Sequence, residues 1–182
     1  MTARDMHNRM FGVTAAQALR WRGTVHTLKR TKATASWLKA LDRVGLAKPP
    51  ANIAIVLTGK TRRRLDDIGA AGLGMEGKTR FVTIFLDDWP VDEFDAVYRL
   101  LSKRMKKLFP MSAKREVLLG YLAQVALHEA GHARQDLKNP DVSVERAEAG
   151  AEEFAWRELE RLLPAETVFR VLAVFGMAAA KR

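Results

Sequence analysis

Three residues in the second half of the chain have the types and the spacing to bind and use a metal ion. His128 and His132 are four residues apart, so on a helix they project from one face, one turn apart. Two imidazole nitrogens placed in this way can meet one Zn²⁺ at about 2.0–2.1 Å. Glu129 lies roughly 100° round the helix from His128, because a turn takes about 3.6 residues. From there its carboxylate can reach a water molecule on the open side of the metal and act as a general base.

The sequence before His128 indicates that this face of the helix is buried. The residues that share the face are apolar: Leu118, Tyr121, Leu122 and Val125. Two histidines without partners on such a face would be costly, and a shared metal ion removes that cost. Gly131 inside a helix costs about 1 kcal/mol relative to alanine, which indicates a neighbour that approaches closely. The alternative is a pair of ordinary histidines on a helix surface.

The third metal ligand is expected on the next helix, predicted over 144–163. The chain has no cysteine, so thiolate ligands are excluded and carboxylates become the main candidates. The inward stripe of this helix is predicted to be Ala151, Ala155, Leu159 and Leu162. Glu148 extends that stripe, and an inward carboxylate on an apolar stripe needs a cation or a proton. Glu148 is therefore the predicted third ligand.

Two further glutamates belong to the same prediction. Glu152 lies one turn after Glu148 and is the candidate acceptor for the second ring N–H of a ligating histidine. Glu145 is the alternative third ligand. The remaining interpretation is a helix edge of glutamates that are all solvated.

These residues together resemble a known group of enzymes. An HExxH helix followed by a helical glutamate is similar to the gluzincin metallopeptidases. The segment Glu148-Ala-Gly-Ala-Glu-Glu-Phe-Ala155, with the later Leu162-Leu163-Pro164, resembles the ExxA(N/D)xFA…LLP pattern of ImmA/IrrE-type peptidases, with Glu152 at the Asn/Asp position. The resemblance implies a zincin-like domain, zinc on His128, His132 and Glu148, and a catalytic Glu129. It also implies that the strand near 80–86 is the edge strand along which an extended substrate lies.

A second motif suggests nucleotide binding but has the wrong surroundings. Residues 72–79 match GxxxxGK[ST], a pattern that holds phosphate at the start of a helix. Here a strand is predicted directly after Thr79, and a Gly/Ala-rich stretch precedes the motif. The Gly-rich segment is therefore expected to be a flexible loop.

The expected elements give an α+β fold. Residues 52–58 and 79–87 are predicted strands, with a short helix and a loop over 59–77 between them. Helices are predicted over 91–108, 113–136, 144–163 and 166–179. Before them, Thr14 and Gln17 form a capping box, Ser36 caps a second helix, and Gly45 ends it. The Pro49-Pro50 pair is the predicted boundary between a basic helical segment, 1–50, and a zincin-like metallopeptidase domain, 51–182.

Charge is concentrated in the first of these segments. The net charge is +10, and residues 1–50 hold ten Lys and Arg against two Asp and Glu. Such an excess attracts polyanions, nucleic acid above all, and makes nucleic acid a candidate partner of residues 1–50; the alternative is a solvated basic face without a specific partner. No apolar run is long enough to span a membrane, and a cytoplasmic protein is expected. The competing functional hypothesis is a nucleic-acid-associated or interaction protein, in which the zinc site is structural or acts on DNA-bound proteins.

Overall fold

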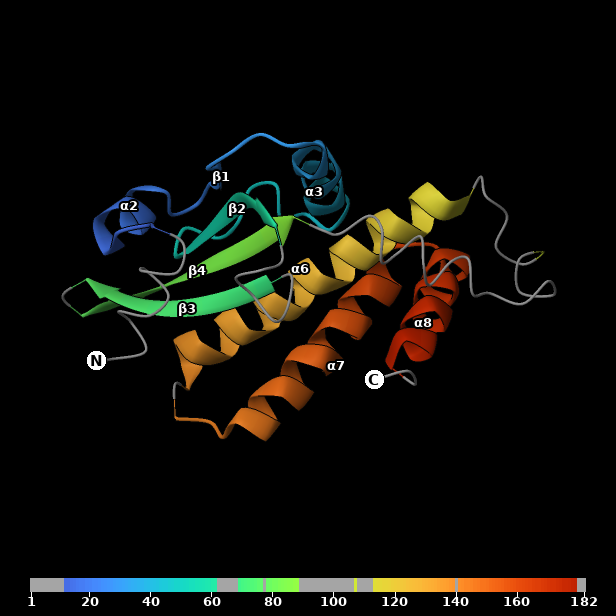
Figure 1. The fold of residues 1–182 in the computed structure, drawn as a ribbon. Helices are drawn as coiled ribbons and strands as arrows, with labels where there is room; N and C mark the ends of the chain where they lie inside the picture. Colours follow the sequence, from blue (N-terminus) through green and yellow to red (C-terminus); the bar gives the residue numbers. More distant parts are fainter. Residues whose placement is uncertain are drawn as a thin grey trace.

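The computed structural model describes residues 12–61, 69–76, 78–88, 107, 113–139 and 141–179. A mixed sheet of four strands lies at its centre (Figure 1). The strands are β1 (Val25–Thr27), β2 (Ile53–Thr61), β3 (Gly69–Glu76) and β4 (Thr79–Asp88). Their order across the sheet is β1-β2-β4-β3. The first three in this order run parallel, and β3 runs antiparallel to β4.

The helices lie on both sides of this sheet. They are α2 (Ala15–Arg20), α3 (Lys32–Arg43), α6 (Lys114–Lys138), α7 (Val144–Leu162) and α8 (Ala165–Ala179). Together with the sheet they confirm the predicted α+β class. Among the described helices, none combines the length and the apolar character needed to cross a bilayer.

Alternation along the strands divides the core between the two faces of the sheet. Ile55 and Ile84 belong to the larger cluster, which includes Trp37 and Leu41 of α3 and Leu122 of α6. The neighbouring side chains Val56 and Phe85 point to the other face, where they pack with Ala18 of α2. Because successive side chains of a strand point to opposite faces, both faces of β2 and β4 must be apolar, as their sequences are. The sheet therefore provides a rigid platform beneath α6.

Residues before the Pro49-Pro50 pair take part in this same sheet and core. Strand β1 pairs with β2, with Val25 opposite Ile55. Trp37 of α3 is fully buried, and its indole N–H donates to the backbone carbonyl of Asp87 on β4 at 2.9 Å. The segment 1–50 thus contains a strand as well as helices. The division of the chain into 1–50 and 51–182 stays a prediction.

The edge of the sheet is not where the sequence analysis placed it. The strand expected as the edge, near 80–86, is β4, and it lies between β2 and β3. Among the described strands the two edges are β1 and β3, and β3 is formed by the Gly-rich segment that was expected to be a loop. Glycine is depleted in strands because it has no side chain to pack, so the pattern concealed this strand. At Gly74 the missing side chain is replaced by its cross-strand partner Phe81, whose ring occupies the space where a Cβ atom would be.

The helix predictions fared better. Helices α6, α7 and α8 begin and end within two residues of the predicted positions. The capping box between Thr14 and Gln17 is present at the start of α2. The second helix, however, is capped by Thr31 and not by Ser36, because Thr31 and Thr34 satisfy each other's backbone amides there. Its predicted end at Gly45 is confirmed by a φ of 72°, which favours glycine.

The helix expected over 91–108 lies outside the described residues except for Lys107. The short helix and loop expected over 59–77 are wrong where this range is described, because residues 59–61 belong to β2 and residues 69–76 form β3. Residues 62–68 and 77 of that range lie outside the described residues. The GxxxxGK[ST] pattern of residues 72–79 ends at Thr79, which is the first residue of strand β4. The motif therefore has no helix N-terminus at which to bind phosphate, as predicted.

A bidentate ion pair joins α3 to the start of α6 and makes folding stability depend on pH. Arg43 Nη1 and Nη2 donate to Glu116 Oε1 and Oε2 at 2.6 and 3.1 Å. These hydrogen bonds are the main cause that lowers the pKa of Glu116 below its ordinary 4.5. A carboxylate whose pKa is lower in the folded protein stabilises the fold above its unfolded pKa. That stabilisation is lost as the pH falls through the folded value.

We expect Glu116→Gln to lower the free energy of unfolding at pH 7 by at most about 1 kcal/mol, since the pair is partly exposed to solvent. Urea denaturation at several pH values measures the effect. The difference from wild type should shrink below pH 4.5 and vanish in more acidic buffer. Glu153→Gln is the matched control, because the Glu153 side chain is 79% exposed and its contact with Arg157 is long, at 4.0 Å. A pH-independent effect of Glu116→Gln would contradict the assignment.

Candidate metal centre

The site lies where α6 and α7 pack against each other. A short connection at 139–143 turns the chain back, so that α7 runs alongside α6 in the opposite direction (Figure 1). The backbones of the two helices are in close contact at Gly131 and Ala151. A Cβ atom on Gly131 would lie 2.8 Å from the Cα of Ala151 and 3.1 Å from its carbonyl oxygen. Only glycine fits at this position, as the sequence analysis expected of Gly131, and the close approach brings side chains of both helices within reach of each other.

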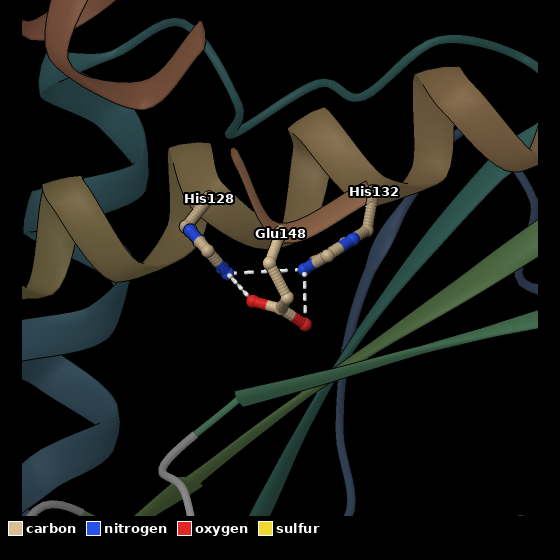
Figure 2. A group of neighbouring side chains, drawn as sticks. All are labelled: His128, His132 and Glu148. Carbon is tan, nitrogen blue, oxygen red and sulfur yellow. Dashed lines mark hydrogen bonds and ion pairs between the residues drawn. The ribbon is translucent and has the colours of Figure 1, made fainter. Parts of the chain in front are cut away.

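Three side chains converge at this contact. His128 and His132 project from α6 and Glu148 projects from α7 (Figure 2). The two imidazole Nε2 atoms are 3.0 Å apart. Glu148 Oε2 lies 3.4 Å from Nε2 of His128, and Oε1 lies 3.4 Å from Nε2 of His132. The structure thus brings together the three residues that the sequence analysis proposed as ligands.

The donor set and its dimensions fit a metal ion of the size of zinc. Two imidazole nitrogens and a carboxylate oxygen form one of the common zinc sites with an open position. For metal–ligand distances near 2.0–2.1 Å, the ligand atoms of a tetrahedral site are about 3.3–3.4 Å apart. The separations of 3.0 and 3.4 Å in this cluster are close to that value. Among the described residues, this is the group of His, Asp and Glu side chains that could hold a metal ion.

The surroundings of His132 favour the neutral form that a metal needs. Burial is the main cause that lowers the pKa of His132 below its ordinary 6.5, and the neighbouring His128 lowers it further. Glu148 and Asp136 act in the opposite direction without reversing the shift. His128 meets a second carboxylate through its other ring nitrogen, because Nδ1 lies 3.1 Å from Oε2 of Glu152. This is the contact that the sequence analysis proposed for Glu152.

Glu129 is held against the sheet. It is only 7% exposed, and a Cβ atom on Gly69 would lie 2.8 Å from both its Cγ and its Oε1. Gly69 is the first residue of the edge strand β3. The carboxylate of Glu129 is therefore located where the edge strand begins, next in sequence to His128. A larger side chain at position 69 would displace it.

The burial of α7 differs in part from the predicted pattern. Ala151, Ala155 and Leu159 are fully buried as predicted, but Leu162 is exposed. The Glu148 side chain is 59% exposed, so its role follows from its distance to the histidines and not from burial. Glu145 is exposed and is not part of the cluster that could hold a metal. Sequence reasoning also missed Gln124 and Trp156, which donate to Glu152.

Comparison of the chain with models of protein families, with curated proteins and with solved structures found no match. The gluzincin and ImmA/IrrE-type resemblance therefore depends on the motif residues themselves, and membership of that family stays a prediction. What can be argued about function comes from the geometry of this cluster and from Glu129 beside it.

The contact at Gly131 leads to a prediction about the helix pair. Gly131→Ala adds a methyl group that meets the backbone of Ala151, which cannot swing away, so α7 must shift. Overpacking of this kind costs about 1–3 kcal/mol, against a gain of about 1 kcal/mol in helix propensity. We expect a net loss of stability by urea denaturation, together with weaker metal binding.

Gly150→Ala is the matched control at the same helix interface. Its new methyl group meets the Nε2 atom of Gln135, the far end of a flexible side chain. This variant should be as stable as wild type or slightly more stable. Equal behaviour of the two variants would show that the approach of the backbones at Gly131 does not set the distance between α6 and α7.

Proposed function

We propose that this protein is a zinc-dependent peptidase of the gluzincin type. The observation that carries the proposal is the cluster of His128, His132 and Glu148, whose ligand atoms lie within 4.8 Å of one another, with the buried Glu129 beside it. A structural metal site commonly has four protein ligands, whereas a catalytic zinc site has three and keeps a position open. Three donors and an adjacent carboxylate that is not a ligand match the second arrangement.

The division of labour among the residues follows from their chemistry. His128, His132 and Glu148 would hold the zinc ion. Bound zinc polarises the carbonyl of a peptide bond and lowers the pKa of a water molecule to about 7. Glu129 accepts a proton on its carboxylate from the attacking water and passes it to the nitrogen of the departing amine. The contact with Gly69 limits the directions in which that carboxylate can turn.

The edge strand β3 supplies a place for an extended substrate. Among the described strands, β3 lies at one end of the order β1-β2-β4-β3, beside β4. A peptide can add to such an edge through backbone hydrogen bonds. Since β3 begins at Gly69, against Glu129, a peptide along this edge would pass the general base. This moves the proposed substrate strand from the residues near 80–86 to 69–76.

The competing hypothesis assigns the same cluster a structural role in a nucleic-acid-associated or interaction protein. A purely structural site has no use for a general base next to the ligands, and the buried Glu129 favours the peptidase. Nucleic acid remains the predicted partner of residues 1–50. Because Trp37 and Leu41 belong to the core, that prediction has to be tested by replacing exposed cations such as Lys29 and Arg30, and not by deleting the segment.

We predict one equivalent of zinc per chain, measured by elemental analysis after dialysis. His132→Ala and Glu148→Ala each remove one of three ligands. Each should weaken zinc binding by more than about 100-fold, which is more than the loss of a hydrogen-bond partner of a ligand typically costs. Glu153→Ala should leave zinc binding unchanged, because the Glu153 side chain is 79% exposed and is not part of the cluster. If Glu145→Ala loses zinc and Glu148→Ala keeps it, the third ligand has been assigned wrongly.

The mechanism makes a separate prediction about Glu129. Glutamine has nearly the same shape but cannot accept the proton, so Glu129→Gln should keep the fold and the zinc. Peptide hydrolysis should fall by about 10² or more, the scale of general-base catalysis. A screen of casein and mixed peptides provides the substrate, and zinc content and thermal unfolding are measured on the same sample. Cleavage at the wild-type rate would exclude Glu129 as the base, whereas zinc binding by a wild type inert on every peptide would favour the interaction protein.

A further inference from the structure

The metal cluster continues into a ladder of polar side chains between the two helices. On α6 the side chains of Gln124, His128 and His132 follow one another at intervals of one turn. On α7 they face three residues at the same interval in the reverse direction: Trp156, Glu152 and Glu148. Two of the facing pairs are in contact across the helices, His128 with Glu152 and His132 with Glu148. In the third pair, Gln124 and Trp156 both donate to Glu152.

Glu152 is the centre of the outer part of this ladder. Its Oε1 accepts from the indole Nε1 of Trp156 at 2.5 Å. Its Oε2 lies 3.2 Å from Nε2 of Gln124 and 3.1 Å from Nδ1 of His128. Gln124 is buried, so its amide is held in place by the packing of α6. A carboxylate with neighbours on both oxygens has little freedom to rotate.

The chemistry of these partners determines where the hydrogen atoms are. An indole nitrogen is only ever a donor, and an ionised carboxylate is only an acceptor. The carboxylate of Glu152 can accept a hydrogen bond from His128 only when Nδ1 carries a proton. In the neutral imidazole, which carries one proton, Nε2 of His128 then presents its lone pair. That nitrogen is the one that points at Glu148 and His132.

We infer that Trp156 and Gln124 are positioning residues that hold the carboxylate of Glu152 and thereby fix His128 in the tautomer that can bind a metal through Nε2. Both donate hydrogen bonds to Glu152, through which they reach the ring of His128. The inference deepens the proposed function because it concerns the same site. It also explains how Glu152, about half exposed, can keep one orientation: Trp156 supplies a fixed donor on its outer side.

The tautomer can be measured without any metal. Nitrogen-15 NMR of the histidine rings in metal-free protein distinguishes Nδ1–H from Nε2–H imidazole. We expect wild-type His128 to be Nδ1-protonated, and Trp156→Phe to show a mixture of tautomers. Gln124→Met gives a second route to the same result should Trp156→Phe fail to fold by circular dichroism. A wild-type His128 that carries its proton on Nε2, or a tautomer that neither variant changes, would overturn the inference.

Zinc affinity separates positioning from a general effect on packing. Changes in the partners of ligating histidines typically weaken metal binding 10–100-fold, and we expect Glu152→Ala to fall in that range. Trp156→Phe should weaken zinc binding about 3–10-fold, at or below the lower end of that range. The matched control Trp21→Phe, a tryptophan that stacks on His26 away from the site, should have no effect.

A double-mutant cycle completes the test. If Trp156 acts through Glu152, Trp156→Phe should cost nothing further in a Glu152→Ala background. Equal losses in both backgrounds would show that Trp156 contributes only to packing, which would overturn the inference. Should wild-type protein bind no zinc at all, the proposed function fails, while the tautomer measurement in metal-free protein still decides the positioning role.

Discussion

The close approach of α6 and α7 at Gly131 and Ala151 is the constraint on which the candidate site depends. Side chains of histidine and glutamate are short compared with the usual 8–10 Å between packed helices. With a glycine on one helix and alanines on the other, Glu148 reaches both imidazoles, and Glu152 reaches the far nitrogen of His128. A larger residue at position 131 would separate the two halves of the ladder at once. The same contact therefore serves stability and the geometry of the cluster.

The sheet positions the remaining chemical group from the other side. Strands β2 and β4 are apolar on both faces, and α6 packs against one of these faces through Val117, Leu122 and Ala126. His128 and His132 then face α7, while Glu129, about 100° further round, faces the start of β3. One helix thus presents the proposed ligands to a helix and the proposed base to a strand. Because Gly69 has no side chain, the strand can approach Glu129 without displacing it.

Much of this arrangement could be predicted from the sequence, and the reasons for success and failure are physical. The long helices α6 and α7 were found because the turn residues at 139–141 and Pro164 mark their ends in the sequence. Caps gave no help, since neither helix begins with a side-chain cap hydrogen bond. The triad His128, His132 and Glu148 was found because helical spacing limits which side chains share a face. The Gly-rich strand β3 was missed because glycine gives no alternating pattern of polar and apolar side chains. The strand forms nevertheless, because the pairing of β3 with β4 uses backbone groups that glycine also has. The order of the strands, and hence the identity of the edge, depends on packing between distant segments that no local pattern records.

Trp156 shows why the outer parts of a site are harder to find than its centre. Nothing in the spacing of Trp156 distinguishes it from an ordinary half-buried aromatic residue on α7, and only the position of its N–H relative to Glu152 gives it a role. The proposed ligands are recognised by their own chemistry, whereas a residue that holds a ligand's partner is recognised by geometry alone. Because the Glu148 side chain is largely exposed, the proposed orientation of His128 depends on the contacts at its other ring nitrogen. In the proposed arrangement, Gln124 of α6 together with Glu152 and Trp156 of α7 orients His128, so that the exposed carboxylate of Glu148 meets a ring that is already positioned.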